Sequence, residues 1–165
     1  MIGFYNRLQA MIASAGNTLQ SPFLLLIRLY WGWQLIQTGW GKLQTLDKVT
    51  QFFTSLGIPA PGMNAVLVAS LEFGGGILLI LGLASRLISI PLTISMFVAF
   101  ITADREALFS IFSDPDKLYA AAPYTFLFAV LLILIFGPGR ISLDELIHRS
   151  FAKDGAPAEQ KPQPR

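Results

Sequence analysis

The chain has no cysteine and a single histidine, which excludes several classes of chemistry. Without cysteine it cannot form a disulfide, an iron–sulfur ligand set, a zinc thiolate site or a catalytic thiol. The one histidine, His148, lies beyond the last long apolar run, so a haem held by histidines of facing helices is not expected. We therefore expect no metal site and no cofactor held by this chain alone.

Charge is scarce as well. Only 13% of the 165 residues are charged and 53% are hydrophobic, whereas a soluble domain carries about 25% charged residues. This is too little polar surface to cover a water-soluble globule, so the lipid bilayer is the expected partner. The basic residues do not cluster, and no nucleic-acid partner is expected.

Four long apolar runs dominate the rest of the sequence. They predict membrane spans at about residues 22–41, 63–83, 87–103 and 120–137, each near the roughly 20 residues that cross a bilayer as a helix. The link between the second and third runs is very short, so these two helices must be antiparallel neighbours. The predicted fold is all-α, a membrane-embedded antiparallel four-helix bundle.

The segments that flank the spans have a different composition. In residues 1–20, apolar side chains recur at three- and four-residue steps, which predicts a short amphipathic helix lying on the membrane surface; a loosely ordered leader is the alternative. Residues 21–149 form the predicted four-helix domain. Residues 150–165 are rich in proline, alanine, glutamine and charge, and are expected to be disordered.

The distribution of basic residues predicts the orientation. With both termini inside, seven lysines and arginines lie on the cytoplasmic side and four lie outside. The positive-inside rule favours this arrangement. We expect a multi-pass protein of the bacterial cytoplasmic (inner) membrane with cytoplasmic N- and C-termini.

Two ionisable residues fall within the predicted spans, where a charge costs about 2.5–3.5 kcal/mol on insertion scales. Arg28 is in the first span and Glu72 in the second, and each shares a helix face with small residues. Counting residues from the span ends places Arg28 and Glu72 about 7 Å apart in depth. We therefore expect Arg28 and Glu72 to pair, directly or through water.

The role of these charges has two interpretations. A buried pair can simply fix helix register, and Arg28 can instead extend to the headgroups. Alternatively, Glu72 can exchange protons or bind a polar headgroup, and the adjacent glycines would let a ligand or another backbone approach. The candidate ligand or proton site is Arg28, Glu72, Lys42, Gly75 and Gly76.

Tryptophans in the first span leave a similar choice. Trp31 and Trp33 could line a quinone-like site or simply pack in the bundle, whereas Trp40 fits the interfacial aromatic belt.

Several short motifs occur in a fixed order around these spans. The sequence contains Arg28-Leu29 with Gly32, Thr38-Gly39-Trp40-Gly41-Lys42-Leu43, Leu56-Gly57-Ile58-Pro59, Leu71-Glu72-Phe73-Gly74-Gly75, Leu81-Gly82-Leu83-Ala84-Ser85-Arg86 and Gly137-Pro138-Gly139-Arg140-Ile141-Ser142-Leu143-Asp144. Between Leu24 and Leu146 the chain resembles the DoxX family of small bacterial membrane proteins. The resemblance implies a four-helix bundle in the inner membrane and a loose association with oxidoreductases, because some relatives are subunits of thiosulfate:quinone oxidoreductase.

Three functions remain open at this level. The leading hypothesis is a membrane subunit of a quinone-linked redox complex, in which Arg28, Glu72 and Lys42 contact a quinone and a partner carries any metal, haem or flavin. The second is a non-enzymatic scaffold or assembly factor for a membrane partner or for a second copy of this chain. The third is a small proton-coupled transporter.

Overall fold

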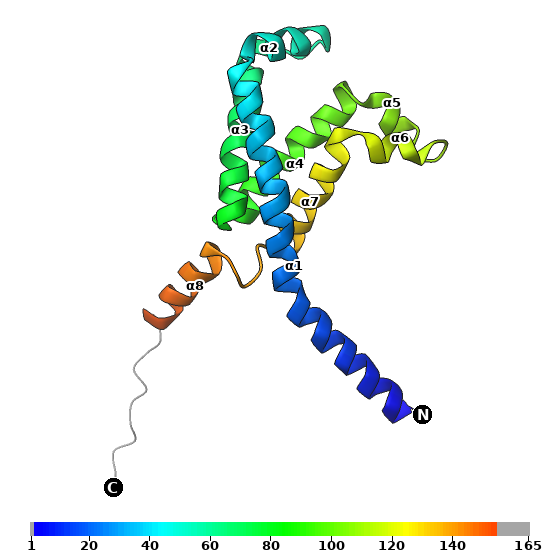
Figure 1. The fold of residues 1–165 in the computed structure, drawn as a ribbon, viewed down its shortest axis with the longest axis vertical. Helices are drawn as coiled ribbons and strands as arrows, with labels where there is room; N and C mark the ends of the chain where they lie inside the picture. Colours follow the sequence, from blue (N-terminus) through cyan, green and yellow to red (C-terminus); the bar gives the residue numbers. More distant parts are fainter. Residues whose placement is uncertain (1, 155–165) are drawn as a thin grey trace.

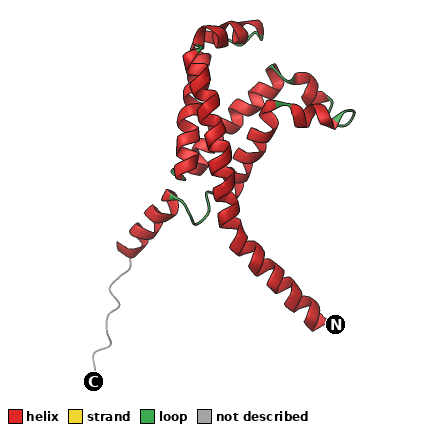
Figure 2. Ribbon diagram, in the orientation of Figure 1, coloured by secondary structure: helices red, strands yellow, loops and turns green. Residues whose placement is uncertain are grey.

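The computed structural model describes residues 2–154, and these residues fold into helices joined by short turns, with no strand among them (Figures 1 and 2). The helices are α1 (Ile2–Gln44), α2 (Leu46–Ser55), α3 (Pro61–Leu81), α4 (Ser85–Thr102), α5 (Arg105–Phe109), α6 (Pro115–Ala120), α7 (Ala122–Phe136) and α8 (Leu143–Asp154). The all-α fold class is confirmed.

Three of these helices are long and apolar enough to cross a membrane: α1, α3 and α4. Helix α7 is equally apolar but has 15 residues. Large apolar side chains remain exposed on all four, among them Phe23, Leu67, Ile94 and Phe128. In water such a surface would promote aggregation, whereas in a membrane it is the expected lipid-facing surface. The fold is therefore that of an all-α membrane protein.

Helix α1 differs from the expected arrangement. A separate amphipathic helix over residues 1–20 was predicted, but the described residues from Ile2 onward continue without a break into the first apolar run. Pro22 lies inside this helix and does not end it. Proline removes one backbone hydrogen bond, and the helical residues on both sides carry the helix through this position. The N-terminal part of α1 projects away from the other helices (Figure 1).

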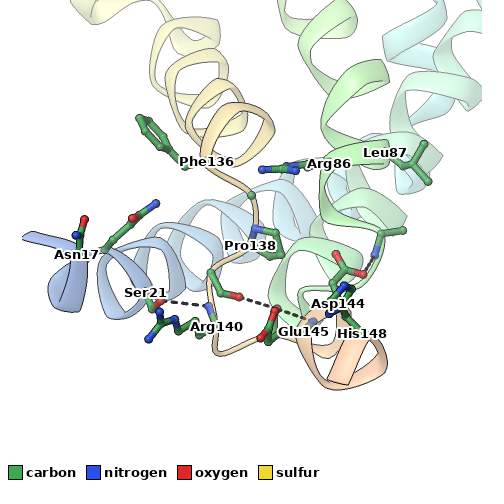
Figure 3. A pocket seen from close by; sticks show the side chains of 15 residues that line it. Asn17, Ser21, Arg86, Leu87, Phe136, Pro138, Arg140, Asp144, Glu145 and His148 are labelled. Carbon is green, nitrogen blue, oxygen red and sulfur yellow. Dashed lines mark hydrogen bonds between the residues drawn. The ribbon is translucent and has the colours of Figure 1, made fainter. Parts of the chain in front are cut away.

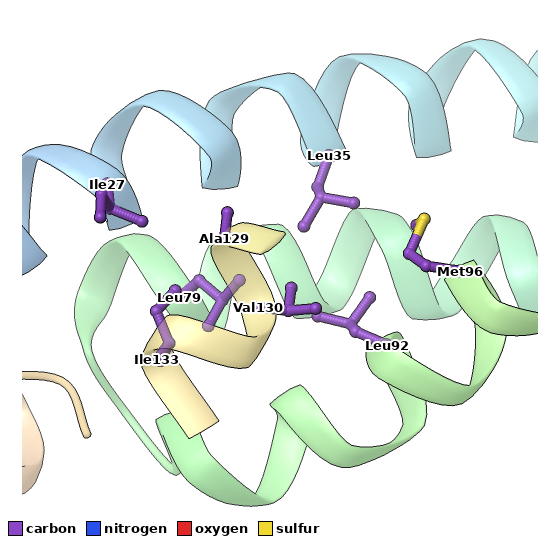
Figure 4. Close-up of a cluster of buried hydrophobic side chains, with 8 residues drawn as sticks. All are labelled: Ile27, Leu35, Leu79, Leu92, Met96, Ala129, Val130 and Ile133. Carbon is purple, nitrogen blue, oxygen red and sulfur yellow. The ribbon is translucent and has the colours of Figure 1, made fainter. Parts of the chain in front are cut away.

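The core lies where α1, α3, α4 and α7 meet (Figure 4). Its fully buried members include Leu35, Leu79, Leu92 and Ile133, one from each of these four helices. Trp31 packs against the edge of this cluster, whereas Trp33 is 55% exposed. A smaller cluster of Phe100, Ala107, Leu118 and Ala121 joins the end of α4 to α5, α6 and the start of α7.

The packed helices have two distinct ends, which we name after the helices that mark them. At the α2 end, α2 runs across the tops of α1 and α3; at the α8 end, the chain leaves α7, turns and enters α8 (Figure 1). Residues 150–154, expected to be disordered, belong to α8, and residues 155–165 lie outside the described part of the chain.

Candidate functional site

Glu72 of α3 forms an ion pair with Lys42, in the last turn of α1. The Lys42 Nζ lies 2.5 Å from Glu72 Oε1 and 2.7 Å from Oε2, so the ammonium donates to both carboxylate oxygens. The Glu72 side chain is 4% exposed and that of Lys42 34%. The pair thus joins a buried carboxylate to a cation that reaches the surface near the α2 end.

Glycines allow α1 and α3 to approach each other closely along this contact. A Cβ added at Gly76 would lie 2.5 Å from the Gly32 carbonyl oxygen, and one at Gly39 would lie 2.8 Å from the Ala69 carbonyl oxygen. Both distances are too short for real atoms, so backbone touches backbone at these positions, as in small-residue helix contacts in membranes.

The three consecutive glycines of α3 face three different surroundings. Gly76 meets α1, whereas a Cβ at Gly75 would lie 3.1 Å from a methyl group of Leu92 on α4. A Cβ at Gly74 would meet nothing within 4 Å. Gly75 and Gly76 therefore serve helix packing, and only Gly74 has free space beside it.

The predicted pair of Arg28 and Glu72 is wrong, because each residue has a different partner. Arg28 donates from Nη2 to the carbonyl oxygen of Ile141, 2.5 Å away, at the α8 end. The glycine contacts between α1 and α3 place Arg28 level with residue 82, just beyond the end of α3. This position is about ten residues, or about 15 Å, from Glu72 along the helix axis. The sequence-based estimate aligned the ends of the two spans and so misplaced one helix along the other.

The surroundings of Arg28 are tight and only partly polar. The residue is 1% exposed, and its Nε and Nη1 atoms have no hydrogen-bond partner among the described residues. Its guanidinium fills the space where a side chain at Gly82 would lie. Gly82 has φ +67°, a left-handed conformation that glycine adopts without strain. The turn between α3 and α4 is thus shaped around Arg28.

The segment between α7 and α8 ties the α8 end together. Asp144 accepts hydrogen bonds from the backbone amides of Ala84 and Ser85 at 2.7 and 3.0 Å, and thereby caps the start of α4. The Asp144 amide donates to the Gly82 carbonyl oxygen at 2.9 Å. The Arg140 amide donates to the Ser21 hydroxyl of α1 (Figure 3). We call residues 137–144 the clasp, because they bond to both α1 and the α3–α4 turn.

Sequence reasoning did not identify the role of Asp144 as a cap of α4, because the two lie 60 residues apart. A local signal was present for α8 itself. The Ser142 hydroxyl accepts a hydrogen bond from the Glu145 amide at 3.2 Å, and a serine three residues before a glutamate is a known helix-start pattern.

The described residues offer little to a metal ion, since no group of three histidine, aspartate or glutamate side chains comes together within residues 2–154. The chemistry that the Lys42–Glu72 pair offers is hydrogen-bond donation from a partly exposed ammonium group.

Comparison with known proteins gives a consistent answer. The DoxX family model matches residues 23–105. The Inner membrane protein YqjF of Escherichia coli is 30% identical over 135 residues, which cover 81% of this chain and 98% of that protein. The Uncharacterized membrane protein Rv3486 of Mycobacterium tuberculosis is 30% identical over 142 residues, covering 82% and 87%.

A third relative carries a name that refers to activity. The "Putative oxidoreductase CatD" of Bacillus subtilis is 33% identical over 85 residues, which cover 52% of this chain and 62% of that protein. No solved structure gives a significant match. With its apolar helices, its glycine-packed α1–α3 contact and these matches, the chain is an integral membrane protein that belongs to the DoxX family.

Proposed function

We propose that this protein is a membrane subunit of a quinone-linked redox complex, and that Lys42 and Glu72 form its quinone contact. The observation that carries the proposal is the ion pair itself, because it places a cation held by a buried carboxylate at one end of an apolar helix contact. The name of the relative CatD supports a redox context. The electrons would come from a flavin or metal centre in a partner protein.

The geometry of the pair suits a carbonyl ligand. An ammonium group has three N–H donors, and two of those of Lys42 go to Glu72. The third is free for a quinone oxygen, and the 34% exposure of Lys42 gives that oxygen access. Glu72 holds the ammonium in place, and the pair can pass a proton to a reduced quinone oxygen.

This role requires a particular placement in the bilayer. In the proposal, α1, α3, α4 and α7 all cross the membrane, and α7 is the shortest of the four. Both termini lie in the cytoplasm, as the basic residues of the sequence favour. The Lys42–Glu72 pair then lies in the outer half of the bilayer, within reach of a quinone headgroup.

Quinone binding to the purified full-length protein in detergent tests the proposal. Binding of a short-chain ubiquinone or menaquinone analogue is measured for wild type, Lys42→Met, Glu72→Gln and Lys48→Met. We expect Lys42→Met to weaken binding about tenfold, since one charge-assisted hydrogen bond is lost. Lys48→Met is the matched control, because Lys48 is an exposed lysine of α2. Unchanged binding in Lys42→Met and Glu72→Gln would refute the site.

A second function, as a scaffold for a membrane partner, is favoured by Gly74. This glycine has open space beside it on a lipid-exposed helix, which is where a partner helix can approach. Partner capture that fails for Gly74→Leu but survives Glu72→Gln would favour the scaffold. Gly41→Leu is the control, because Gly41 also has nothing within 4 Å.

A further inference from the structure

A cavity of about 760 Å³ opens at the α8 end, far from the Lys42–Glu72 pair. Its walls come from α1, the start of α4, the clasp and the first turns of α8. Arg86 reaches in from α4, and Arg140 lies beside Ser21 of α1 (Figure 3). The cavity therefore lies where the apolar helices α1, α4 and α7 give way to polar residues at the α8 end.

The charges that line this cavity are not equally engaged. Asp144 has both oxygens on the Ala84 and Ser85 amides, and Glu145 accepts a hydrogen bond from Arg149 at 2.8 Å. That bond lowers the pKa of Glu145, so this carboxylate stays ionised beside Arg149.

The two arginines of the cavity have no carboxylate partner within the described residues. Arg86 makes only a 3.4 Å contact with the Ile135 carbonyl oxygen, and the Arg140 side chain is exposed. Both acids are thus ionised but have their oxygens engaged by other donors. Neither guanidinium group is ion-paired within the described residues, although Arg140 contributes to the lowered pKa of Glu145.

An apolar groove of about 350 Å³ adjoins the polar cavity. It runs between α1 and α7 and is lined by Gly16, Leu19, Phe23, Leu24 and Leu132, together with Gln20 and Phe136, which also line the polar cavity. The polar cavity with its two arginines and the apolar groove thus meet at Gln20 and Phe136.

We propose that this combined site binds an anionic phospholipid, with the phosphate at Arg86 and Arg140 and one acyl chain in the α1–α7 groove. Arginine forks match phosphate oxygens well, and basic pockets at the cytoplasmic side of membrane helices favour anionic headgroups. The apolar groove distinguishes a lipid from a free phosphate ion, because only a lipid would occupy both parts. The proposal is independent of the quinone contact, since it uses neither Lys42 nor Glu72.

The headgroup part of the site is tested by lipid competition. The full-length protein is placed in nanodiscs of phosphatidylcholine with increasing phosphatidylglycerol, and bound lipid is measured by native mass spectrometry. We expect Arg86→Gln with Arg140→Gln to lower the preference for phosphatidylglycerol about thirtyfold, since each interfacial arginine contributes about fivefold. Arg7→Gln removes a positive charge from α1 outside the cavity and should change nothing.

The groove is tested with two glycines that both have open space beside them. Gly16→Trp would fill the groove, whereas Gly3→Trp places the same side chain on α1 outside it. We expect only Gly16→Trp to reduce phosphatidylglycerol binding. If Gly16→Trp has no effect and inorganic phosphate competes with the lipid, the site takes a soluble anion and the lipid proposal is overturned. An unchanged lipid preference in the double arginine variant, with helix content and melting as in wild type, also overturns it.

Discussion

The carbonyl oxygen of Gly32 on α1 lies only 2.5 Å from the position that a Cβ atom at Gly76 of α3 would occupy. This contact sets how close the two helices come and how they are aligned. Because Ala69 and Gly76 are spaced seven residues apart, as are Gly39 and Gly32, two such contacts form at once.

Gly76→Leu should therefore destabilise the protein by about 3 kcal/mol, because overpacking a close contact typically costs 1–3 kcal/mol and backbone atoms cannot yield easily. Unfolding in mixed micelles with increasing SDS measures this. Gly74→Leu adds the same side chain two residues away in open space and should unfold nearly as wild type. Equal losses in both variants would mean that the α1–α3 contact does not limit stability.

The Lys42–Glu72 pair predicts an asymmetric mutant cycle. Lys42→Met leaves a carboxylate that is 4% exposed without a partner, which should cost about 3 kcal/mol. Glu72→Gln should cost less, because Lys42 is 34% exposed and can turn toward water. The double variant should be more stable than Lys42→Met alone. Comparing the free energies of unfolding of the four proteins checks this, and a costlier Glu72→Gln would contradict the assigned burial.

Gly82→Ala and Gly57→Ala separate backbone strain from side-chain contact. Both glycines have positive φ, +67° and +71°, so alanine pays about 1–2 kcal/mol at either position. Gly57 has nothing within 4 Å, whereas Gly82 lies against the Arg28 guanidinium.

We expect Gly82→Ala to lower the free energy of unfolding by at least about 2 kcal/mol more than Gly57→Ala does, because an overpacked contact costs roughly this amount. Thermal melting of the two variants in detergent measures the difference. Similar melting temperatures would show that Arg28 can move aside freely.

Asp144→Ala should release the start of α4. The carboxylate caps the Ala84 and Ser85 amides, and loss of such a cap costs about 1–2 kcal/mol. Hydrogen exchange should speed up in the first turn of α4 and stay unchanged in α3. Asp47→Ala, at an exposed acid in the first turn of α2, is the control and should leave α4 exchange unaffected.

Hydropathy predicted where α3 and α4 lie, because it sums a preference over about 20 residues and tolerates errors at single positions. It could not predict the depth of Arg28 relative to Glu72. Apolar runs have soft ends, and aligning those ends shifted α1 against α3 by about five residues. The alignment of α1 with α3 could have been inferred from two matching seven-residue spacings, Gly32 to Gly39 and Ala69 to Gly76.

The partner of Glu72 could have been found from that spacing, since it brings the end of α1 within a lysine's length of position 72. The partner of Arg28 could not, because it is a backbone carbonyl 113 residues away. Local patterns carry no signal for such a contact. The continuous α1 was missed for a different reason, because Pro22 and a polar N-terminal stretch both indicated a break that does not occur.

The clasp has a consequence for how this protein is made. Arg28 is translated early, in the first apolar helix, yet the oxygen that receives its guanidinium belongs to Ile141. Until residue 141 has been synthesised, Arg28 of α1 cannot make this hydrogen bond and must have other surroundings in the membrane. Insertion of α1 and completion of the fold are therefore separate events, and the second requires the synthesis of residue 141.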